Sequence, residues 1–359
     1  MDLSYRSNGY DVLSYAECLN LVDKIDIDTI NKLYKGNKSY MNFKFIGKGG
    51  QGKVYLISSK TCGCIVMKVM KLSSDIELLI NKQCREIINK SICPNFLYYY
   101  GARRIKYYGL TFSEYADGTL EDWLHSAHSY TEWRSFMFQF LVGVLVIQRI
   151  LKTFHSDLKP KNIFFKKLDR NIAFEYNISG SKYIVPTLGN LYILSDFGRA
   201  KSLIFKNSSN LNSVELFIKN NADLEHIIDL HKRIIVNSAE RIYSLDDLIK
   251  IIKLKNDEYF EAYYQDTKES INKDLAKYPQ HVRNKMIHRS VVYYVVEKDY
   301  IDPYSIPRDK IVMELPPREI IAQISEWKKY KNIEDILQTF NEFKNATEDL
   351  KIIKFTLKN

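Results

Sequence analysis

Three polar side chains suited to handling a phosphoryl group lie in one short segment, HSDLKPKN, at residues 155–162. Asp157 can accept a hydrogen bond from an attacking hydroxyl, Lys159 can neutralise charge on a γ-phosphate, and Asn162 offers a neutral oxygen to Mg²⁺. Phosphoryl transfer from ATP depends mainly on such positioning and charge neutralisation. Taken alone, the segment is equally compatible with a solvated turn, because aspartate, lysine, proline and asparagine are common in loops.

A glycine-rich segment, IGKGGQGKV, lies upstream at residues 46–54 and has the spacing GxGxxG. Apolar and β-favouring residues flank it on both sides, which predicts strand, glycine turn, strand. A dinucleotide-binding turn would instead open an amphipathic helix. A hairpin tip without side chains lets backbone N–H groups approach phosphates, and a merely flexible hairpin is the alternative. The candidate nucleotide-binding residues here are Ile46, Gly47, Gly49, Gly50, Gly52 and Val54.

Two further charged residues belong to apolar strands. Lys68 is the one charge within CIVMKVM, residues 64–70, and a lysine in such a strand is costly unless it meets an anion. The alternative is an edge-strand lysine that discourages aggregation. Downstream, LYILSDFGRA at residues 191–200 is predicted to be a strand that ends in Asp196, and we expect this carboxylate to be a second magnesium ligand.

In this order, the glycine-rich segment, Lys68, HSDLKPKN and DFG at residues 196–198 resemble the motifs of eukaryotic-type protein kinases. The resemblance covers roughly residues 41–200. It implies an α+β fold of two lobes, with a small strand-rich N-lobe that contains one main helix and a larger, mainly helical C-lobe. It also implies transfer of the γ-phosphate of Mg-ATP to protein substrates, and Lys159 favours serine or threonine over tyrosine as the acceptor.

The resemblance assigns two further parts of the site. FSEYADGTL, residues 112–120, is similar to the hinge between the lobes, where Glu114 and Ala116 would offer backbone groups to adenine. Kinases of this type also carry a glutamate that pairs with the strand lysine. Glu77 and Glu86 are the candidates, and at 100° per residue they project from opposite sides of a helix. We favour Glu77 because it shares a face with apolar residues.

The chain also departs from the family pattern. Ser156 replaces the arginine that usually follows the catalytic histidine, so the cationic partner for a phosphorylated activation loop is missing. We therefore expect activity that is independent of activation-loop phosphorylation. No APE motif follows DFG, and an amphipathic segment at residues 221–236 contains Asp223, our candidate for the aspartate that braces the catalytic turn. Only about residues 199–220 remain for an activation segment.

The interval between Asn162 and Asp196 is long and is predicted to form strands, with Gly180 and Gly189 marking turns. A strand pair of this kind before the metal aspartate resembles haspin-like kinases and the divergent kinases of poxviruses and other large DNA viruses. The sequence thus suggests a viral source.

We expect four parts along the chain: an N-terminal helical extension at 1–40, an N-lobe at 41–113, a hinge at 114–118 and a C-lobe with a divergent end at 119–359. Within the last part, RSVVYYVVEKDYIDPY at residues 289–304 is strand-like. Candidate helices close the chain at residues 317–330 and 333–343.

The composition fits one intracellular, monomeric enzyme of 359 residues, placed in the cytoplasm, or in the host cytoplasm or virion for a viral protein. The sequence has no secretory signal and no apolar run of membrane-spanning length. The longest apolar run, at residues 136–147, leads into the catalytic turn and is predicted to be a buried core helix. Five cysteines without a paired CxxC motif do not suggest a metal site. The net charge of +10 is spread along the chain, so direct nucleic-acid binding is an alternative that we do not favour. A pseudokinase or scaffold that binds nucleotide without turnover is the other alternative.

Overall fold

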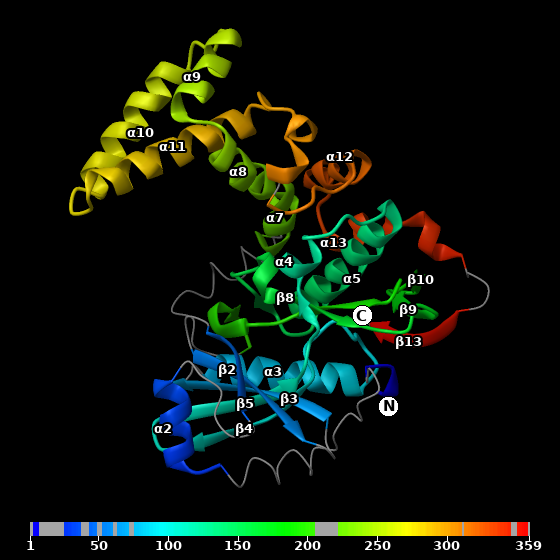
Figure 1. The fold of residues 1–359 in the computed structure, drawn as a ribbon. Coiled ribbons are helices and arrows are strands. Elements are labelled where there is room, and N and C mark those ends of the chain that lie inside the picture. The colour runs from blue at the N-terminus through cyan, green and yellow to red at the C-terminus, as the bar shows by residue number, and fades with distance from the viewer. Residues whose placement is uncertain are drawn as a thin grey trace. The chain divides into compact units, whose positions relative to one another are not determined.

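The computed structural model describes residues 3–6, 25–36, 43–48, 52–59, 63–71, 75–204, 222–310, 312–345 and 350–357. The chain forms two compact units (Figure 1). The first comprises residues 1–123, 129–227 and 322–359, and the second comprises 124–128 and 228–321. The expected C-lobe at 119–359 is therefore divided between the two units.

A five-stranded antiparallel sheet forms the N-lobe of the first unit, in the order β1-β2-β3-β5-β4. On the central strand, Ile65, Met67 and Val69 are buried on one face, and Lys68 therefore belongs to the other face. Helix α3 covers the face of Lys68. The elements are β1 (Phe43–Lys48), β2 (Gly52–Ser59), β3 (Gly63–Lys71), α3 (Asp75–Asn89), β4 (Tyr99–Ile105) and β5 (Tyr108–Glu114).

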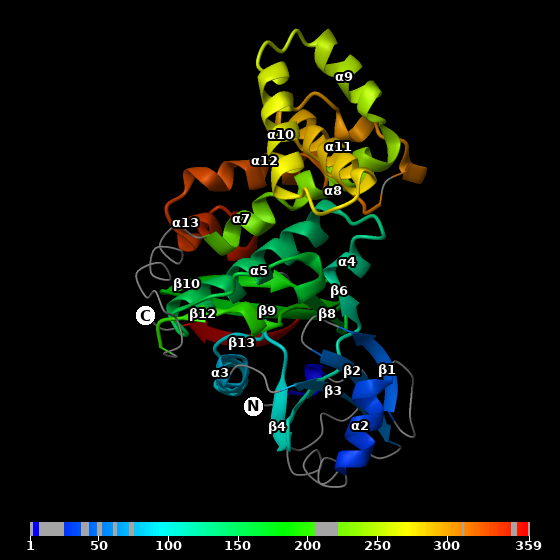
Figure 2. The ribbon, with the colours of Figure 1, turned by 90° about the vertical axis from the view of Figure 1, so that its left-hand side faces the viewer.

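Helix α2 (Ile27–Lys35) packs against the opposite face of this sheet (Figure 2). Asp26 caps it by accepting a hydrogen bond from the Thr29 N–H at 2.7 Å. Ile30 and Leu33 are fully buried in the same apolar cluster as Met67. Residues 25–36 of the expected N-terminal extension are thus integral to the core of the N-lobe.

The remainder of the first unit is built around helix α5 (Tyr130–Arg149), which begins at a capping box formed by Ser129 and Glu132. Its residues from Trp133 to Gln148 are buried, as expected for the apolar run before the catalytic turn. Strands β8 (Ile163–Lys167) and β11 (Asn190–Leu194) form a hairpin, and β6 (Gly118–Thr119) pairs with β8. The short strands β7 (Thr153–Phe154) and β12 (Lys201–Ser202) pair with each other.

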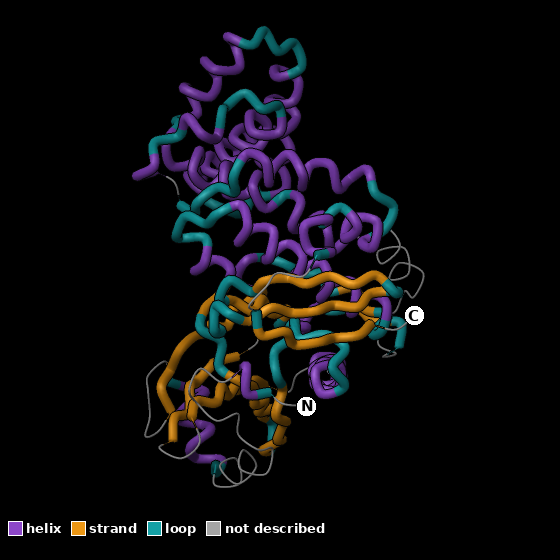
Figure 3. Tube along the Cα trace, turned by 90° about the vertical axis from the view of Figure 1, so that its right-hand side faces the viewer, coloured by secondary structure: helices purple, strands orange, loops and turns teal. Residues whose placement is uncertain are grey.

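The strand pair expected between Asn162 and Asp196 is present as β9 (Ile172–Ile178) and β10 (Ser181–Pro186). Gly180 lies in the turn between them with a φ of +86°, a conformation that glycine adopts without strain. The C-terminal strand β13 (Lys351–Leu357) adds to β9 in parallel, which gives the three-stranded sheet visible in Figure 3.

The 3₁₀ turn η1 (Ser4–Arg6) lies beside this sheet, where Tyr5 makes edge contacts with Phe174 and Phe355. The sheet therefore joins the two ends of the described chain. The other elements of this region, of which α7 and α12 extend into the second unit, are α4 (Leu120–Trp123), η2 (Pro160–Asn162), η3 (Phe197–Arg199), α7 (Ala222–Ile228), α12 (Arg318–Glu326), η6 (Trp327–Lys329), α13 (Ile333–Gln338) and η7 (Asn341–Lys344). The last four lie at the positions expected for the closing helices.

The described residues of the second unit form helices and loops without a strand. The prediction of a strand-like run at residues 289–304 is wrong, because residues 289–297 belong to helix α11 (Gln280–Glu297). Val291, Val292, Val295 and Val296 all face the apolar core of the unit, so burial at helical spacing outweighs the β-propensity of valine. The other elements are α8 (Leu230–Ile242), α9 (Leu245–Leu254), α10 (Phe260–Asp274), η4 (Pro303–Ser305) and η5 (Arg308–Lys310).

Across the described part of the chain, no helix combines the length and the apolar character that a membrane crossing requires.

The burial of α2 predicts a large effect from its truncation. Leu33→Ala removes a side chain that is fully buried against the N-lobe sheet, and we expect it to lower the free energy of unfolding by about 2–5 kcal/mol. Lys35→Ala on the exposed side of the same helix is the control, with an expected change within about 0.5 kcal/mol. Urea denaturation measures both, and equal stability of the two variants would show that α2 is dispensable to the N-lobe.

Candidate active site

Lys68 lies between two carboxylates. Its Nζ donates to Oε1 of Glu77 at 2.9 Å and contacts Oδ1 of Asp196 at 3.4 Å. Burial alone would lower the pKa of Lys68, but the two carboxylates hold it above its usual value, so the ammonium stays charged. Lys68 is not an edge-strand lysine that discourages aggregation, because β3 is the central strand of its sheet.

Of the two candidate glutamates, the structure brings Glu77 to the lysine. Its side chain is buried on the inner face of α3, whereas Glu86 contacts its neighbour Arg85 at 3.4 Å. The helical facing that favoured Glu77 in the sequence accounts for this outcome. Among the described residues, Oε2 of Glu77 has no hydrogen-bond partner although it is buried. Glu77 therefore has an acceptor atom to spare beside Lys68.

The catalytic turn holds its three polar side chains together. Nδ2 of Asn162 donates to the Asp157 carbonyl at 2.8 Å and to Asp157 Oδ2 at 2.9 Å. Lys159 Nζ donates to the same carboxylate at 2.9 Å. Burial would raise the pKa of Asp157, but Lys159, Asn162 and Arg199 hold it below its usual range. Asp157 is therefore an ionised acceptor, and Asn162, whose amide N–H groups face Asp157, has its amide oxygen left for a cation.

Asp223 braces this turn from α7, as expected from the sequence. Its two carboxylate oxygens accept the backbone N–H groups of His155 at 2.8 Å and of Ser156 at 3.1 Å. Burial raises the pKa of Asp223 to about 7, although the two backbone hydrogen bonds oppose the shift.

His155 has a structural position. Its Nε2 lies 2.9 Å from the carbonyl oxygen of Ser195, and its ring contacts Phe197 at a centroid distance of 4.8 Å. Burial lowers the pKa of His155 to about 4, so the ring is neutral at physiological pH. The histidine thus links the catalytic turn to the DFG segment and does not serve as a base.

Backbone conformation also shapes the site. Asp196 has φ and ψ of 62° and 63°, and Ser156 has a φ of 59°, so the backbone of both residues has a positive φ typical of the left-handed region. Non-glycine residues adopt this conformation where the surrounding contacts enforce it. The Ser195 N–H donates to the Asn162 carbonyl at 3.2 Å, which ties the turn before Asp196 to the catalytic turn.

The glycine-rich segment connects β1 to β2, in agreement with the predicted strand, turn, strand pattern. Gly49 and Gly50 lie outside the described residues. A side chain at Gly52 would place its Cβ 2.4 Å from the carbonyl oxygen of Val69, so this position accepts only glycine. Val54 pairs directly with Lys68 across the strands and shares its face, whereas Ile46 is exposed. Gly47 lies at a register shift of the β1–β2 pair.

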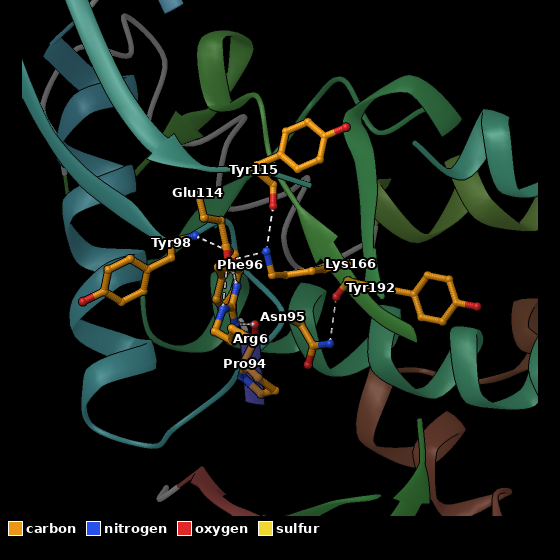
Figure 4. Close-up of polar contacts among 9 residues, drawn as sticks. All are labelled: Arg6, Pro94, Asn95, Phe96, Tyr98, Glu114, Tyr115, Lys166 and Tyr192. Atoms are coloured by element: carbon orange, nitrogen blue, oxygen red, sulfur yellow. Dashed lines mark hydrogen bonds and ion pairs between the residues drawn. The ribbon is translucent and has the colours of Figure 1, made fainter. Parts of the chain in front are cut away.

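The hinge residues lie at the end of β5. Ala116 is half-buried, and the side chain of Glu114 is buried in an ion pair with Arg6 (Figure 4). Lys166 from β8 also approaches this carboxylate, at 3.7 Å. Sequence reasoning missed both cations, because neither lies in a recognisable motif.

The donor set suits Mg²⁺ and a polyphosphate. Lys68 offers an ammonium to phosphate oxygens, and Asp196 and Asn162 offer the hard oxygen ligands that Mg²⁺ prefers. No cluster of three or more His, Cys, Asp or Glu side chains among the described residues could hold a metal by itself. Magnesium in proteins commonly keeps water and substrate phosphates as ligands, so one carboxylate and one amide are compatible with it.

The site combines a glycine-rich strand pair beside a strand lysine, a helix glutamate, an Asp-Lys-Asn turn and the aspartate after β11. These features define a protein kinase fold of two lobes, and the expected α+β architecture is confirmed. Residues 40–217, about half of the chain, match the protein kinase domain family.

The chain is also similar to a probable serine/threonine-protein kinase, 380R, of Invertebrate iridescent virus 6. The two are 28% identical over 196 residues, which cover 45% of this chain and 36% of the viral protein. The chain thus matches only about a third of the length of that relative. Residues 40–217 form a divergent protein kinase domain that resembles the kinases of large DNA viruses.

The position of His155 predicts a pH dependence of stability. In the unfolded chain, His155 is protonated below its ordinary pKa of 6.5, whereas in the folded protein it is protonated only below about pH 4. The free energy of unfolding therefore falls as the pH drops from about 6.5 to about 4. Thermal unfolding of the wild type and of His155→Gln should show the unfolding temperature of the wild type falling further between about pH 6.5 and 4. Asp223 titrates in both proteins, so its contribution cancels in the comparison. If the unfolding temperatures of the two proteins fell equally with pH, His155 would not be a buried neutral histidine.

Proposed function

We propose that this chain is a serine/threonine protein kinase that transfers the γ-phosphate of Mg-ATP to hydroxyl groups of protein substrates. The observation that supports it best is the convergence of Lys68, Glu77 and Asp196 in one cluster with ion-pair distances of 2.9 and 3.4 Å. The kinase domain match and the name of the viral relative agree with this reaction class.

Each side chain has one task in the proposed reaction. Lys68, oriented by Glu77, binds the α- and β-phosphates, and the ionised Asp157 orients the acceptor hydroxyl and takes its proton. Lys159 neutralises the charge that develops on the γ-phosphate. Asn162 and Asp196 would hold Mg²⁺, which would supply further neutralisation of the phosphate charge.

The hinge and the glycine-rich segment complete the nucleotide site in this proposal. Glu114 and Ala116 offer backbone groups to adenine, while Ile46 and Val54 contact the base from the N-lobe. Gly47 and Gly52 let the backbone approach the phosphates, and the same role stays a prediction for Gly49 and Gly50, which lie outside the described residues.

Activity independent of activation-loop phosphorylation belongs to the same proposal. A phosphorylated loop usually acts by pairing with cationic side chains, and Ser156 stands where the family has an arginine. The Ser156 hydroxyl donates instead to the carbonyl oxygen of Arg199, which links the catalytic turn to the residues after DFG without a phosphate.

Asp157→Asn tests the reaction directly. The amide keeps the size of the side chain but cannot take the hydroxyl proton, so we expect phosphate transfer to casein or to the kinase itself to fall by about 10²- to 10⁴-fold. Asp309→Asn, an exposed aspartate in the second unit, is the matched control and should leave the rate unchanged. Radiolabelled γ-phosphate measures the rate, and thermal unfolding verifies the fold. Full activity in Asp157→Asn would overturn the mechanism, and a wild type that binds ATP without consuming it would favour a scaffold.

Phosphatase treatment tests the independence from activation. We expect the wild type, once stripped of phosphate and separated from the phosphatase, to transfer phosphate at its original initial rate, because the chain lacks the arginine through which a loop phosphate would act. Mass spectrometry establishes that the phosphate has been removed. An initial rate that collapses on dephosphorylation and recovers with a lag on incubation with ATP would show that a phosphate switch exists.

A further inference from the structure

Arg6 lies outside the kinase domain match, yet its side chain is buried against the hinge (Figure 4). Its guanidinium donates to the carbonyl oxygens of Pro94 and Phe96, each at 2.8 Å, and binds both carboxylate oxygens of Glu114. The loop that carries these carbonyls is itself anchored to β11, because Asn95 Nδ2 donates to the Tyr192 carbonyl at 2.9 Å. The two carbonyl acceptors of Arg6 therefore belong to an anchored loop.

Two cations share the single carboxylate of Glu114. Arg6 makes the close ion pair, and Lys166 Nζ remains 3.7 Å from Glu114 Oε2. Lys166 donates instead to the carbonyl oxygen of Tyr115 at 2.8 Å. Burial would raise the pKa of Glu114, but Arg6 and Lys166 hold it below its usual range, so the group remains a carboxylate.

The Lys166 contact determines the direction of one hinge peptide group. In a trans peptide the C=O of Tyr115 and the N–H of Ala116 point in opposite directions. With the carbonyl held by Lys166, the Ala116 N–H points away from the buried cluster. Two nearby peptide groups are also anchored, because the Glu114 N–H of the Ser113–Glu114 peptide donates to the Tyr98 carbonyl at 2.9 Å and the Asp117 N–H of the Ala116–Asp117 peptide donates to the Phe165 carbonyl at 3.0 Å.

We propose that Arg6 is a positioning residue for adenine: by occupying the carboxylate of Glu114, it leaves Lys166 on the Tyr115 carbonyl, and the Ala116 N–H is presented to the base. This inference rests on the proposed function only in that a nucleotide binds at the hinge. Without Arg6, the buried carboxylate attracts Lys166, and the Tyr115 carbonyl loses its donor. Because Glu114 then still has a cation, the protein folds while the hinge peptide becomes free to rotate.

The test separates the base from the phosphates. Calorimetric titration with Mg-ADP and with Mg-tripolyphosphate, which lacks a base, is performed on the full chain. Arg6→Met is expected to bind ADP about tenfold more weakly, the equivalent of one hydrogen bond, and to bind tripolyphosphate as the wild type does. Arg149→Met, which removes a partly exposed ion pair with Glu334 away from the hinge, is the matched control and should change neither affinity.

A second variant distinguishes positioning from a merely structural role. In Arg6→Met combined with Glu114→Gln, no carboxylate remains to attract Lys166, so we expect ADP affinity to recover towards that of the wild type. If Arg6 only stabilised the fold, the double variant would bind worse than the single one. Like Arg6→Met, Lys166→Met should bind ADP more weakly and tripolyphosphate as tightly as the wild type does.

Unchanged ADP affinity in Arg6→Met, an equal loss for both ligands, or no recovery in the double variant would overturn the inference. A wild type that fails to bind ADP would overturn it as well. If the wild type binds ADP and the variants behave as expected but no phosphate is transferred, the inference stands and only the proposed activity fails.

Discussion

The arrangement of the candidate site depends on the need to balance the charge of Lys68. The residue lies on the central strand of an otherwise apolar sheet segment, and only 20% of its side chain is exposed. A buried ammonium is stable only beside negative charge, so α3 and the turn after β11 must both bring a carboxylate to it. Movement of α3 away from the sheet would leave the buried Glu77 without a cation. The packing of α3 against the N-lobe sheet and the position of the Lys68 ammonium therefore depend on the same ion pair.

The hinge shows the same physics with the charges exchanged. There the buried group is the carboxylate of Glu114, and the cations come from η1 and β8, two segments distant in sequence. Because two cations face one carboxylate, the surplus donor goes to a backbone carbonyl. Because Arg6 pairs with the buried carboxylate, Lys166 is left to hold the Tyr115 carbonyl, and this contact fixes the direction of the hinge peptide.

Much of the site could be predicted from the sequence because its residues lie in short motifs with fixed spacing. Lys68, Asp157, Asn162 and Asp196 were recognised in this way, and Glu77 followed from which face of a helix is apolar. Arg6 and Lys166 could not be found, because their partners are 108 and 52 residues away in sequence and no local pattern marks them. Long-range charge pairing leaves no periodic signal.

The fold was predictable to the same extent and for the same reason. The glycine hairpin, the buried helix α5 and the β9–β10 pair were identified from periodicity and turn residues. Residues 289–297 were misassigned, because valine and tyrosine favour strands locally, and only the packing of α11 against the second unit's core decides for a helix. The parallel pairing of β13 with β9 could not be predicted from the sequence either, because it joins residues that are 179 positions apart.

The kinase domain match at residues 40–217 contains the reactive groups but not all of the structure that holds them. Asp223, which fixes the backbone of the catalytic turn, follows the match, and α2, which covers the apolar face behind Lys68, precedes it. A chain limited to residues 40–217 would leave the backbone N–H groups of His155 and Ser156 without their carboxylate and would expose Met67. Buried donors without acceptors and uncovered apolar faces both destabilise a fold. The flanking segments are therefore part of what makes the motif residues a site.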